Sequence, residues 1–528
     1  MDRREFVEKS AAGVAISRVK LAHREPPPDS FALSEVSIAE LQARMTAGRA
    51  TSRQLVDLYT RRIADLDQRG PRLGHVLEVN PDARSIADQL DQERRAGRVR
   101  GPLHGIPILI KDNVATADQM ETTAGSLALL GARPPRDSTL ARKLREAGAV
   151  ILGKTNLSEW ANFRSSRSTS GWSGRGGQCH NAYAWDRQPS GSSSGSGVGA
   201  ASSSCAAAIG TETSGSIISP ATASGVVGLK PTVGLISRSG IIPISHTQDT
   251  AGPMARTVAD AAALLTALAG TDPTDEATAE ADAHKSDYVR ALDADGLRGA
   301  RLGILRGTNV DPKIQPIYDA AIAVLRERGA ELVDPLTFTP QLTGGGDLLS
   351  WEFKTDLELY LAQWAPTSPV KTLDDLIAFN RREAAREMPY FQQETVETAA
   401  RRGPLTSPEY LQLKERLLRA ARADGIDAIM QAQRLDAIVT LSGGPARPID
   451  LVSGDSGGGT GIPGVTGVAA TAGYPHITVP TGYVHGLPVG LSFAGRAWSE
   501  ATLIRLAFAY EQASRARRPP TFAPRPAL

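Results

Sequence analysis

The chain has 528 residues, with 59 Lys and Arg against 57 Asp and Glu and a formal net charge of +2 at pH 7. This near-balance argues against a nucleic-acid or membrane-surface protein, because both need a clustered excess of positive charge. No apolar run reaches the ~20 residues that a bilayer span requires. Hydrophobic residues make up 41% of the chain, which is enough for a large core and too many for a disordered protein.

Cysteine and histidine usage gives no sign of a metal site. The two cysteines, Cys179 and Cys205, are too few for a disulfide framework and lie in no metal-ligand spacing. The eight histidines are scattered along the chain, without an H-x-x-x-H pair. The sequence therefore predicts neither a zinc nor a di-iron site.

Residues 1–33 form an N-terminal segment that is either flexible or similar to an export signal. Arg3-Arg4 is followed by a short apolar run over 11–16, as in twin-arginine signals. Arg18 and Lys20 interrupt the continuation of that run, and no A-x-A cleavage site follows. Export by the twin-arginine route and a cytoplasmic location are therefore equal alternatives.

From residue 37 onward, the apolar positions follow helix and strand periods in turn. Helices are predicted where apolar residues recur at three- and four-residue steps, and strands where short β-branched runs are bounded by Gly, Pro or charges. In chain order this predicts helices over 38–45 and 55–63, a strand over 106–110, a helix over 139–147, a strand over 150–152, a buried helix over 196–207, a strand over 301–305, helices over 313–328 and 407–421, strands over 437–440, 476–479 and 489–493, and a helix over 499–514. The acidic stretch 272–287 is predicted to lie on the surface.

These elements predict one large α/β domain. The order strand, helix, strand over 106–152 favours parallel pairing. No flexible linker divides residues 34–516, so we expect a single domain there, with a central mixed, twisted β-sheet covered on both faces by α-helices. Residues 517–528 are expected to form a Pro-rich C-terminal tail.

One motif matches a phosphate-binding loop in its letters but not in its physical setting. Gly148 to Thr155 fits the pattern G-x-x-x-x-G-K-[ST]. That loop must follow a strand, so that its N–H groups are free to point at phosphates. Here the four middle residues, Ala149 to Leu152, are themselves the predicted strand, and their amides belong to a ladder. The motif therefore does not predict a nucleotide site.

A second motif, G-x-S-x-G over 191–195, would make Ser193 the nucleophile of a Ser-His-Asp esterase. That motif needs a hydrophobic strand directly before it, whereas residues 181–190 have the composition of a loop. The best base for this alternative is His476. It is the weaker interpretation of the serine-rich region.

The region from Lys111 to Pro231 carries a different arrangement. Lys111 directly follows a predicted buried strand, where apolar neighbours would favour its neutral amine and let it act as a general base. The serine-rich loop over 189–196 then supplies hydroxyls, and Thr211 to Ser216 forms a second small-residue loop. Gly215 allows a sharp turn there, so that successive N–H groups can converge on one point, as an oxyanion requires.

Taken together, these blocks resemble the amidase signature family. Their order and spacing agree, and Ser192 and Ser216 lie 24 residues apart, as in that family. The blocks are Pro102 to Pro107 with Lys111 to Asn113, Gly153 to Trp160, Gly191 to Ser196, Thr211 to Ser216, Val226 to Thr232, Gln248 to Arg256 and Gly486 to Leu491. The resemblance implies the amidase signature fold, and the likeness within the family is greatest to peptide amidases, which remove the C-terminal amide nitrogen of peptides. Three residues depart from the usual pattern, namely Ser190, Glu212 and Ser214.

The resemblance also implies a mechanism. It makes Ser216 the nucleophile, Ser192 a bridging hydroxyl on a cis peptide and Lys111 the base, with the backbone N–H groups of Thr213, Ser214, Gly215 and Ser216 as the oxyanion hole. Neither a metal nor an organic cofactor is implied. Trp160, Phe163 and Trp172 are candidates for the acyl pocket, although a buried Trp is more often plain packing.

Two other functions stay open at this point. A glutaminase-type subunit of a transamidase complex would have the same fold and would need a partner. A binding protein that keeps the fold without catalysis would be unexpected, because Lys111, Ser192 and Ser216 are all present. We expect a stand-alone amidase that acts on peptide amides or similar small amides, with no obligate protein partner, no nucleic acid and no membrane association.

Overall fold

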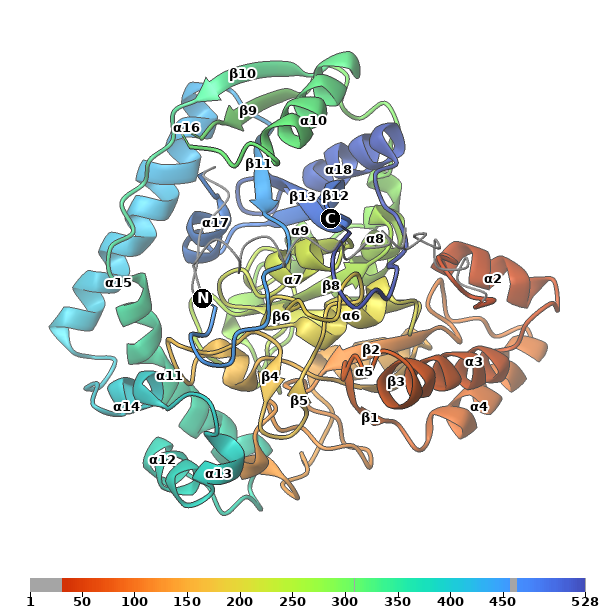
Figure 1. Ribbon diagram of the computed structural model, residues 1–528, viewed down its shortest axis with the longest axis vertical. Helices are drawn as coiled ribbons and strands as arrows, with labels where there is room; N and C mark the ends of the chain where they lie inside the picture. The colour runs from red at the N-terminus through yellow and green to blue at the C-terminus, as the bar shows by residue number, and fades with distance from the viewer. Residues whose placement is uncertain (1–30, 308, 456–462, 528) are drawn as a thin grey trace, which may run out of the picture. The chain divides into compact units, whose positions relative to one another are not determined.

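The six strands that the sequence predicts all lie in the largest sheet. The computed structural model describes residues 31–307, 309–455 and 463–527 (Figure 1). The chain divides into two units, Met1–Ala32 and Leu33–Leu528. The proposed export signal in the first residues lies outside the described residues.

Eleven of the described strands form one mixed sheet, in the order β1-β3-β2-β6-β8-β7-β12-β13-β11-β9-β10. A small hairpin of two further strands lies apart from it. The bounds in the large sheet are β1 (Val76–Val79), β2 (Pro107–Lys111), β3 (Val150–Thr155), β6 (Ala207–Glu212), β7 (Val227–Lys230), β8 (Thr250–Ala255), β9 (Arg301–Leu305), β10 (Glu331–Leu336), β11 (Ala437–Gly443), β12 (His476–Val484) and β13 (Leu487–Ala494), and those of the hairpin are β4 (Trp172–Ser173) and β5 (Gly177–Gln178).

Helices flank this sheet and supply the rest of the core. The helices are α2 (Ile38–Thr46), α3 (Ser52–Ala64), α4 (Ala83–Arg95), α5 (Thr139–Glu146), α6 (Ser194–Ala201), α7 (Ile218–Ala223), α8 (Val258–Leu268), α9 (Ala281–His284), α10 (Gln315–Glu327), α11 (Gly345–Trp364), α12 (Leu373–Arg382), α13 (Ala384–Glu387), α14 (Glu394–Ala400), α15 (Pro408–Ala421), α16 (Asp427–Ala432), α17 (Thr466–Ala472) and α18 (Glu500–Ser514). The predicted fold class, a mixed sheet with helices packed on it, is confirmed.

Two of the three strands around the candidate site pair as the sequence predicts. β2 pairs in parallel with β3, and α5 is the crossover between them. β6 pairs in parallel with β2 on its other side, with Ile110 opposite Ile209. The carboxyl ends of β2 and β6 therefore lie at the same edge of the sheet, where ligand sites of such sheets commonly form.

The motif over 148–155, whose letters match a phosphate-binding loop, contains a strand, as predicted. Val150 to Thr155 pairs with β1 on one side and with β2 on the other. The Lys154 ammonium is buried and donates to the Val114 carbonyl and to the Thr122 hydroxyl. The backbone groups that would have to bind a phosphate are therefore engaged in the pairing of this strand with its neighbours.

Two sequence expectations are wrong in detail. The buried helix expected over 196–207 is α6, which is shorter because the chain turns after Ala201 to enter β6. The acidic stretch 272–287 does not lie wholly on the surface. Asp272 and Asp275 are buried. Their carboxylates accept hydrogen bonds from Ser237 and Arg238, respectively, which offset the loss of contact with water.

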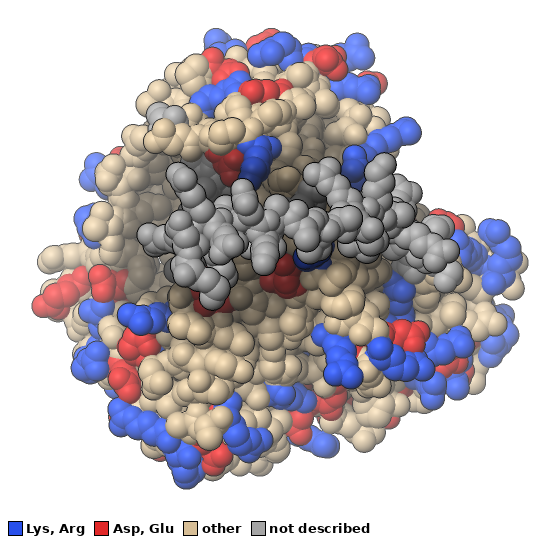
Figure 2. All heavy atoms as spheres, in the orientation of Figure 1, with Lys and Arg blue, Asp and Glu red and all other residues tan. Residues whose placement is uncertain are grey.

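The surface shows no large region of one charge sign on the face drawn in Figure 2. Basic and acidic side chains are interspersed there, which agrees with the net charge of +2. Among residues 31–307, 309–455 and 463–527, no helix has both the length and the apolar character that crossing a bilayer requires.

Every residue of α6 is buried, and its glycines let it approach the neighbouring backbone closely. A Cβ atom added at Gly195 would lie 2.2 Å from the His75 carbonyl oxygen and 2.6 Å from that of Asn156. We expect Gly195→Ala to destabilise the fold by about 3 kcal/mol or more, because overpacking against backbone cannot be relieved by a rotamer change. The midpoint of thermal unfolding measures this loss.

The matched control is Gly346→Ala in α11, where an added Cβ would meet nothing within 4 Å. Alanine favours helix over glycine, so this variant should unfold at the same temperature as the parent protein or slightly above it. Equal midpoints for the two variants would contradict the packing described for α6.

Candidate active site

Lys111 is the last residue of β2 and is fully buried. Its Nζ donates to the Oγ of Ser192 at 2.8 Å, to the Oγ of Ser193 at 3.1 Å and to the Oγ1 of Thr211 at 2.9 Å. These oxygens come from the two serines that precede α6 and from the C-terminal end of β6. The structure thus joins two of the predicted site residues, Lys111 and Ser192, by a direct hydrogen bond.

Burial lowers the pKa of Lys111 to about 7, although the carboxylates of Asp249 and Glu212 favour the ammonium form. Lys154 and Lys230 are also buried, and burial lowers the pKa of each to about 8. The amines of these two lysines donate mainly to backbone carbonyls. Among the three, Lys111 is the lysine that contacts serine hydroxyls.

Ser192 is held by backbone contacts on both sides. The peptide bond between Gly191 and Ser192 is cis, as the family resemblance implies. The Ser192 carbonyl accepts a hydrogen bond of 3.1 Å from the N–H of Ser158. The Ser158 hydroxyl lies so close that a Cβ atom at residue 191 would be 2.2 Å from it. Glycine at 191 is therefore required by close packing.

The turn between β6 and α7 is bound through its oxygens. The Thr213 carbonyl accepts from Gln248 Nε2 at 3.2 Å, and the Ser216 carbonyl accepts from the N–H of Ser193 at 3.2 Å. The Gly215 carbonyl accepts from the N–H of Ser219 at 2.8 Å. In contrast, the N–H groups of Thr213, Ser214, Gly215 and Ser216 have no hydrogen-bond acceptor among the residues that the structure describes.

Ser216 lies beside the lysine cluster without joining it. Its carbonyl contact with Ser193 brings the turn next to the serine loop, and its side chain is nearly buried. Within the described part of the chain, its hydroxyl makes no hydrogen bond, so the direct contact with Ser192 that a proton relay needs is not formed here. Catalytic hydrogen bonds are often long until substrate binds.

Asp249 is a site residue that sequence reasoning missed. One oxygen of its partly buried carboxylate accepts from the Thr213 hydroxyl. The other oxygen accepts from the N–H groups of Ile244 at 2.7 Å and Ser245 at 2.9 Å. Burial raises the pKa of Asp249 to about 6, in spite of these three donors. It stood inside a matched sequence block, but only the fold shows that it reaches the turn.

A family model described as amidase matches residues 54–504. The chain belongs to the amidase family. This confirms the family that the sequence blocks resemble. The protein is thus a hydrolase that acts on amide C–N bonds.

Individual relatives match this amidase over nearly its whole length. A solved peptide amidase from Stenotrophomonas maltophilia is 50% identical, with a TM-score of 0.87 over 93% of this chain and 99% of that chain. A probable amidase of Arabidopsis thaliana is 42% identical over 506 residues, which are 93% of each protein. A glutamyl-tRNA(Gln) amidotransferase subunit of Halorhodospira halophila is 33% identical over 503 residues, covering 91% of this chain and 97% of that protein.

A cavity of about 200 Å³ adjoins the Thr211–Thr213 segment of the amidase. The three aromatic residues that sequence reasoning suggested for an acyl pocket do not line it. Trp160 belongs to a hydrophobic cluster, Phe163 packs against that cluster, and Trp172 packs against Phe391. The aromatic residues that line the cavity are instead Tyr360 and Trp364 of α11.

His246, Glu352 and Asp356 form a group whose ligand atoms lie within 4.8 Å of one another. Both nitrogens of the imidazole are already engaged. Nδ1 contacts Asp356 at 3.0 Å, and Nε2 lies 3.5 Å from Glu352 and 3.2 Å from the Tyr410 hydroxyl. The hydrogen bond to Asp356 and the field of Glu352 raise the pKa of His246, although burial opposes this. The imidazole is therefore already held by Asp356, Glu352 and Tyr410, and a metal ion would have to displace these contacts.

The esterase alternative does not assemble in this amidase. His476 lies in β12, and its Nε2 bonds to the Ser492 hydroxyl at 2.6 Å. Burial lowers its pKa to about 3. The Ser193 hydroxyl instead contacts Lys111 and donates to the Thr211 carbonyl.

Proposed function

We propose that this amidase hydrolyses carboxamides through an acyl-enzyme, with Ser216 as nucleophile, Ser192 as bridging hydroxyl and Lys111 as base. The observation that carries the proposal is the 2.8 Å hydrogen bond between the fully buried Lys111 amine and Ser192. A serine hydroxyl is a weak nucleophile at neutral pH and needs a group that takes its proton. A lysine with a pKa of about 7 has a large neutral fraction near that pH.

In the proposed reaction, neutral Lys111 takes the proton of Ser192, and Ser192 takes that of Ser216. The Ser216 oxygen forms a bond to the amide carbon, and the carbonyl electron pair moves onto oxygen. When this oxyanion collapses, the C–N bond breaks and the proton returns through Ser192 to the nitrogen, which leaves as ammonia. Water then cleaves the ester by the same route. The relay requires Ser216 to come within hydrogen-bond distance of Ser192 when substrate is bound.

The free N–H groups of Thr213, Ser214, Gly215 and Ser216 are the proposed oxyanion hole. The carbonyls of Thr213, Ser216 and Gly215 are held by Gln248, Ser193 and Ser219, so that the turn is fixed before substrate arrives. Preorganised donors of this kind stabilise developing negative charge without reorganisation.

Peptides with a C-terminal carboxamide are the proposed substrates. The support is the 50% identity to a protein named as a peptide amidase, against 33% to an amidotransferase subunit. All the proposed reacting groups come from one chain, so the mechanism needs no second subunit and no cofactor.

The identity of the acylated serine tests the mechanism. The protein turns over a peptide amide, and the reaction is quenched with acid. We expect the acyl group of the substrate to be attached to the proteolytic fragment that contains Ser216. Mass spectrometry of the digested protein measures this. Ser216→Ala should form no acyl-enzyme, whereas Ser193→Ala should still be acylated at Ser216, at a reduced rate because Ser193 contacts Lys111. Acylation of Ser193 would support the esterase alternative and overturn the proposal.

The pH dependence of kcat/KM tests the role of Lys111. Since the neutral amine is the active form and its pKa is about 7, kcat/KM should fall about tenfold per pH unit below 7 and level off above it. The carboxylate of Glu212 favours the ammonium, so Glu212→Gln should move this acid limb to lower pH. Asp424→Asn, at an exposed residue far along the chain, is the control and should leave the limb in place. A limb that does not respond to Glu212→Gln would argue against Lys111 as the titrating base.

A substitution at Gly215 tests the proposed role of the turn as the oxyanion hole. Its φ of +84° lies in the region that favours glycine, and an added Cβ would lie 3.1 Å from Ser219 Oγ. We expect Gly215→Ala to lower kcat by about 10²–10³, the usual effect of losing an oxyanion donor, with a smaller change in KM. Steady-state ammonia release measures both constants. A change in KM alone would assign the turn to ground-state binding.

A further inference from the structure

The cavity beside the turn is placed to hold part of the substrate. Thr211 and Thr213 line one side of it, next to the hydroxyl that contacts Lys111 and to the proposed oxyanion donors. Residues 238–246 and the C-terminal half of α11 line the other side. In the proposed reaction the leaving group is ammonia, which is much smaller than this cavity of about 200 Å³. The part of the substrate that the cavity would hold is therefore the acyl side.

Part of the cavity lining is apolar. It includes Ile241, Ile242, Ile244, Tyr360 and Trp364. Such a wall suits the hydrocarbon stem of a long side chain, which loses contact with water when it binds.

The charged residues around the cavity are unequal in number. Four carboxylates line it, those of Glu212, Asp249, Asp275 and Asp356, against two cationic groups, Arg238 and His246.

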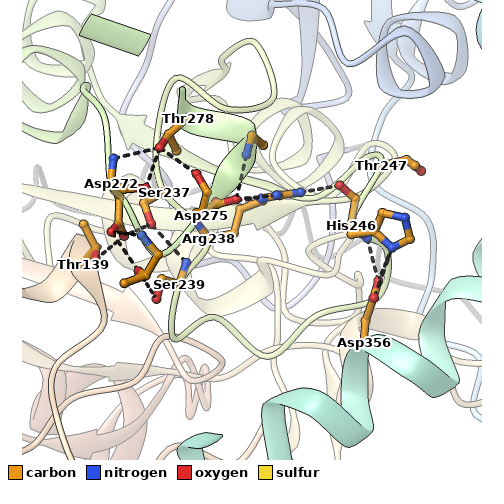
Figure 3. Close-up of polar contacts among 12 residues, drawn as sticks. Thr139, Ser237, Arg238, Ser239, His246, Thr247, Asp272, Asp275, Thr278 and Asp356 are labelled. Carbon is orange, nitrogen blue, oxygen red and sulfur yellow. Dashed lines mark hydrogen bonds and ion pairs between the residues drawn. The ribbon is translucent and has the colours of Figure 1, made fainter. Parts of the chain in front are cut away.

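Two ion pairs neutralise half of these carboxylates. Arg238 contacts Asp275 through Nε at 2.9 Å, and His246 contacts Asp356 at 3.0 Å. Figure 3 shows Arg238 between Asp275 and His246, with Asp356 reaching the imidazole from α11. Asp275 and Asp356 therefore each face a cation.

Glu212 and Asp249 have no cationic partner at ion-pair distance in the described part of the chain. Glu212 accepts from the N–H groups of Ile217 and Ile218, and Asp249 accepts from uncharged donors. Neutral donors solvate a carboxylate but leave its negative charge in place. The field in the cavity is therefore negative whenever both groups are ionised.

Two residues that line the cavity carry a buried acceptor atom without a donor. The Oδ1 atom of Asn113 and the Oε1 atom of Glu212 have no hydrogen-bond partner among the described residues, and both side chains are almost completely buried. Their uncompensated partial negative charges add to the negative field beside the cavity.

We propose that this cavity binds the side chain of the C-terminal residue of a peptide amide and selects lysine or arginine there. The apolar wall takes the stem, and the unneutralised carboxylates attract the cationic end. This inference rests on the proposed function, because it assigns the acyl side of that reaction to the cavity.

The test compares charged and neutral substrates of similar size. The pairs are N-acetyl-alanyl-arginine amide against the citrulline amide, and N-acetyl-alanyl-lysine amide against the norleucine amide. The acetyl group removes the α-ammonium, so the side chain carries the only positive charge. We expect kcat/KM to be about tenfold or more higher for the charged member of each pair, since tenfold corresponds to ~1.4 kcal/mol.

Two variants should move this ratio in opposite directions. Asp356→Asn leaves the His246 charge unpaired and should lower the arginine-to-citrulline ratio about tenfold at low salt. His246→Gln leaves Asp356 unpaired and should raise the ratio. Because each variant is compared with itself on two substrates, a general loss of active enzyme cancels.

The outcomes separate this inference from the proposed function. Equal rates on charged and neutral peptide amides overturn the cavity assignment while the peptide amidase activity stands. A preference for arginine that neither variant changes also overturns it, because the cation would then bind elsewhere. Hydrolysis of none of the four peptide amides overturns the proposed function itself.

Discussion

The candidate site depends on one buried amine, that of Lys111. Removing an ammonium from water strongly disfavours its charged form, and burial alone would take the pKa far below the usual value. Four oxygens accept from Nζ, and the fields of Asp249 and Glu212 oppose the effect of burial. The balance leaves the pKa at about 7, where the amine is neutral often enough to take a proton and basic enough to hold it.

The sheet explains why this amine can lie where it does. β2 and β6 are parallel neighbours, so Lys111 and Thr211 reach the same edge together. The helix that delivers Ser192 must then approach both strands, and α6 consists of Ser, Gly, Ala and Val because larger residues would not fit. The low-complexity composition of this region is therefore a packing requirement of an ordered core, not the mark of a linker.

The sequence indicated the proposed reacting groups more clearly than their surroundings. Lys111, Ser192 and the turn to Ser216 lie in compact blocks whose letters and spacing are specific, and strands such as β2 and β3 have a clear β-branched composition. β6 and β8 were missed because more than half of their residues are Ala, Gly or Pro, which carry little strand signal. The cavity could not be predicted, since its walls come from segments more than 100 residues apart, and Trp160 illustrates how a buried aromatic residue near a motif can be simple packing.

The turn after β6 faces two electrostatic demands at once. Its free N–H groups are suited to negative charge on the reacting oxygen, yet Glu212 and Asp249, which fix its ends, are themselves carboxylates. Both carboxylates keep Lys111 basic, and both oppose the oxyanion that the turn is proposed to stabilise. A cation held in the adjoining cavity would offset that repulsion without lying against the amine. In this arrangement the side chain of the substrate would contribute to the stability of the transition state as well as to binding, and the selectivity would be expressed in kcat as well as in KM.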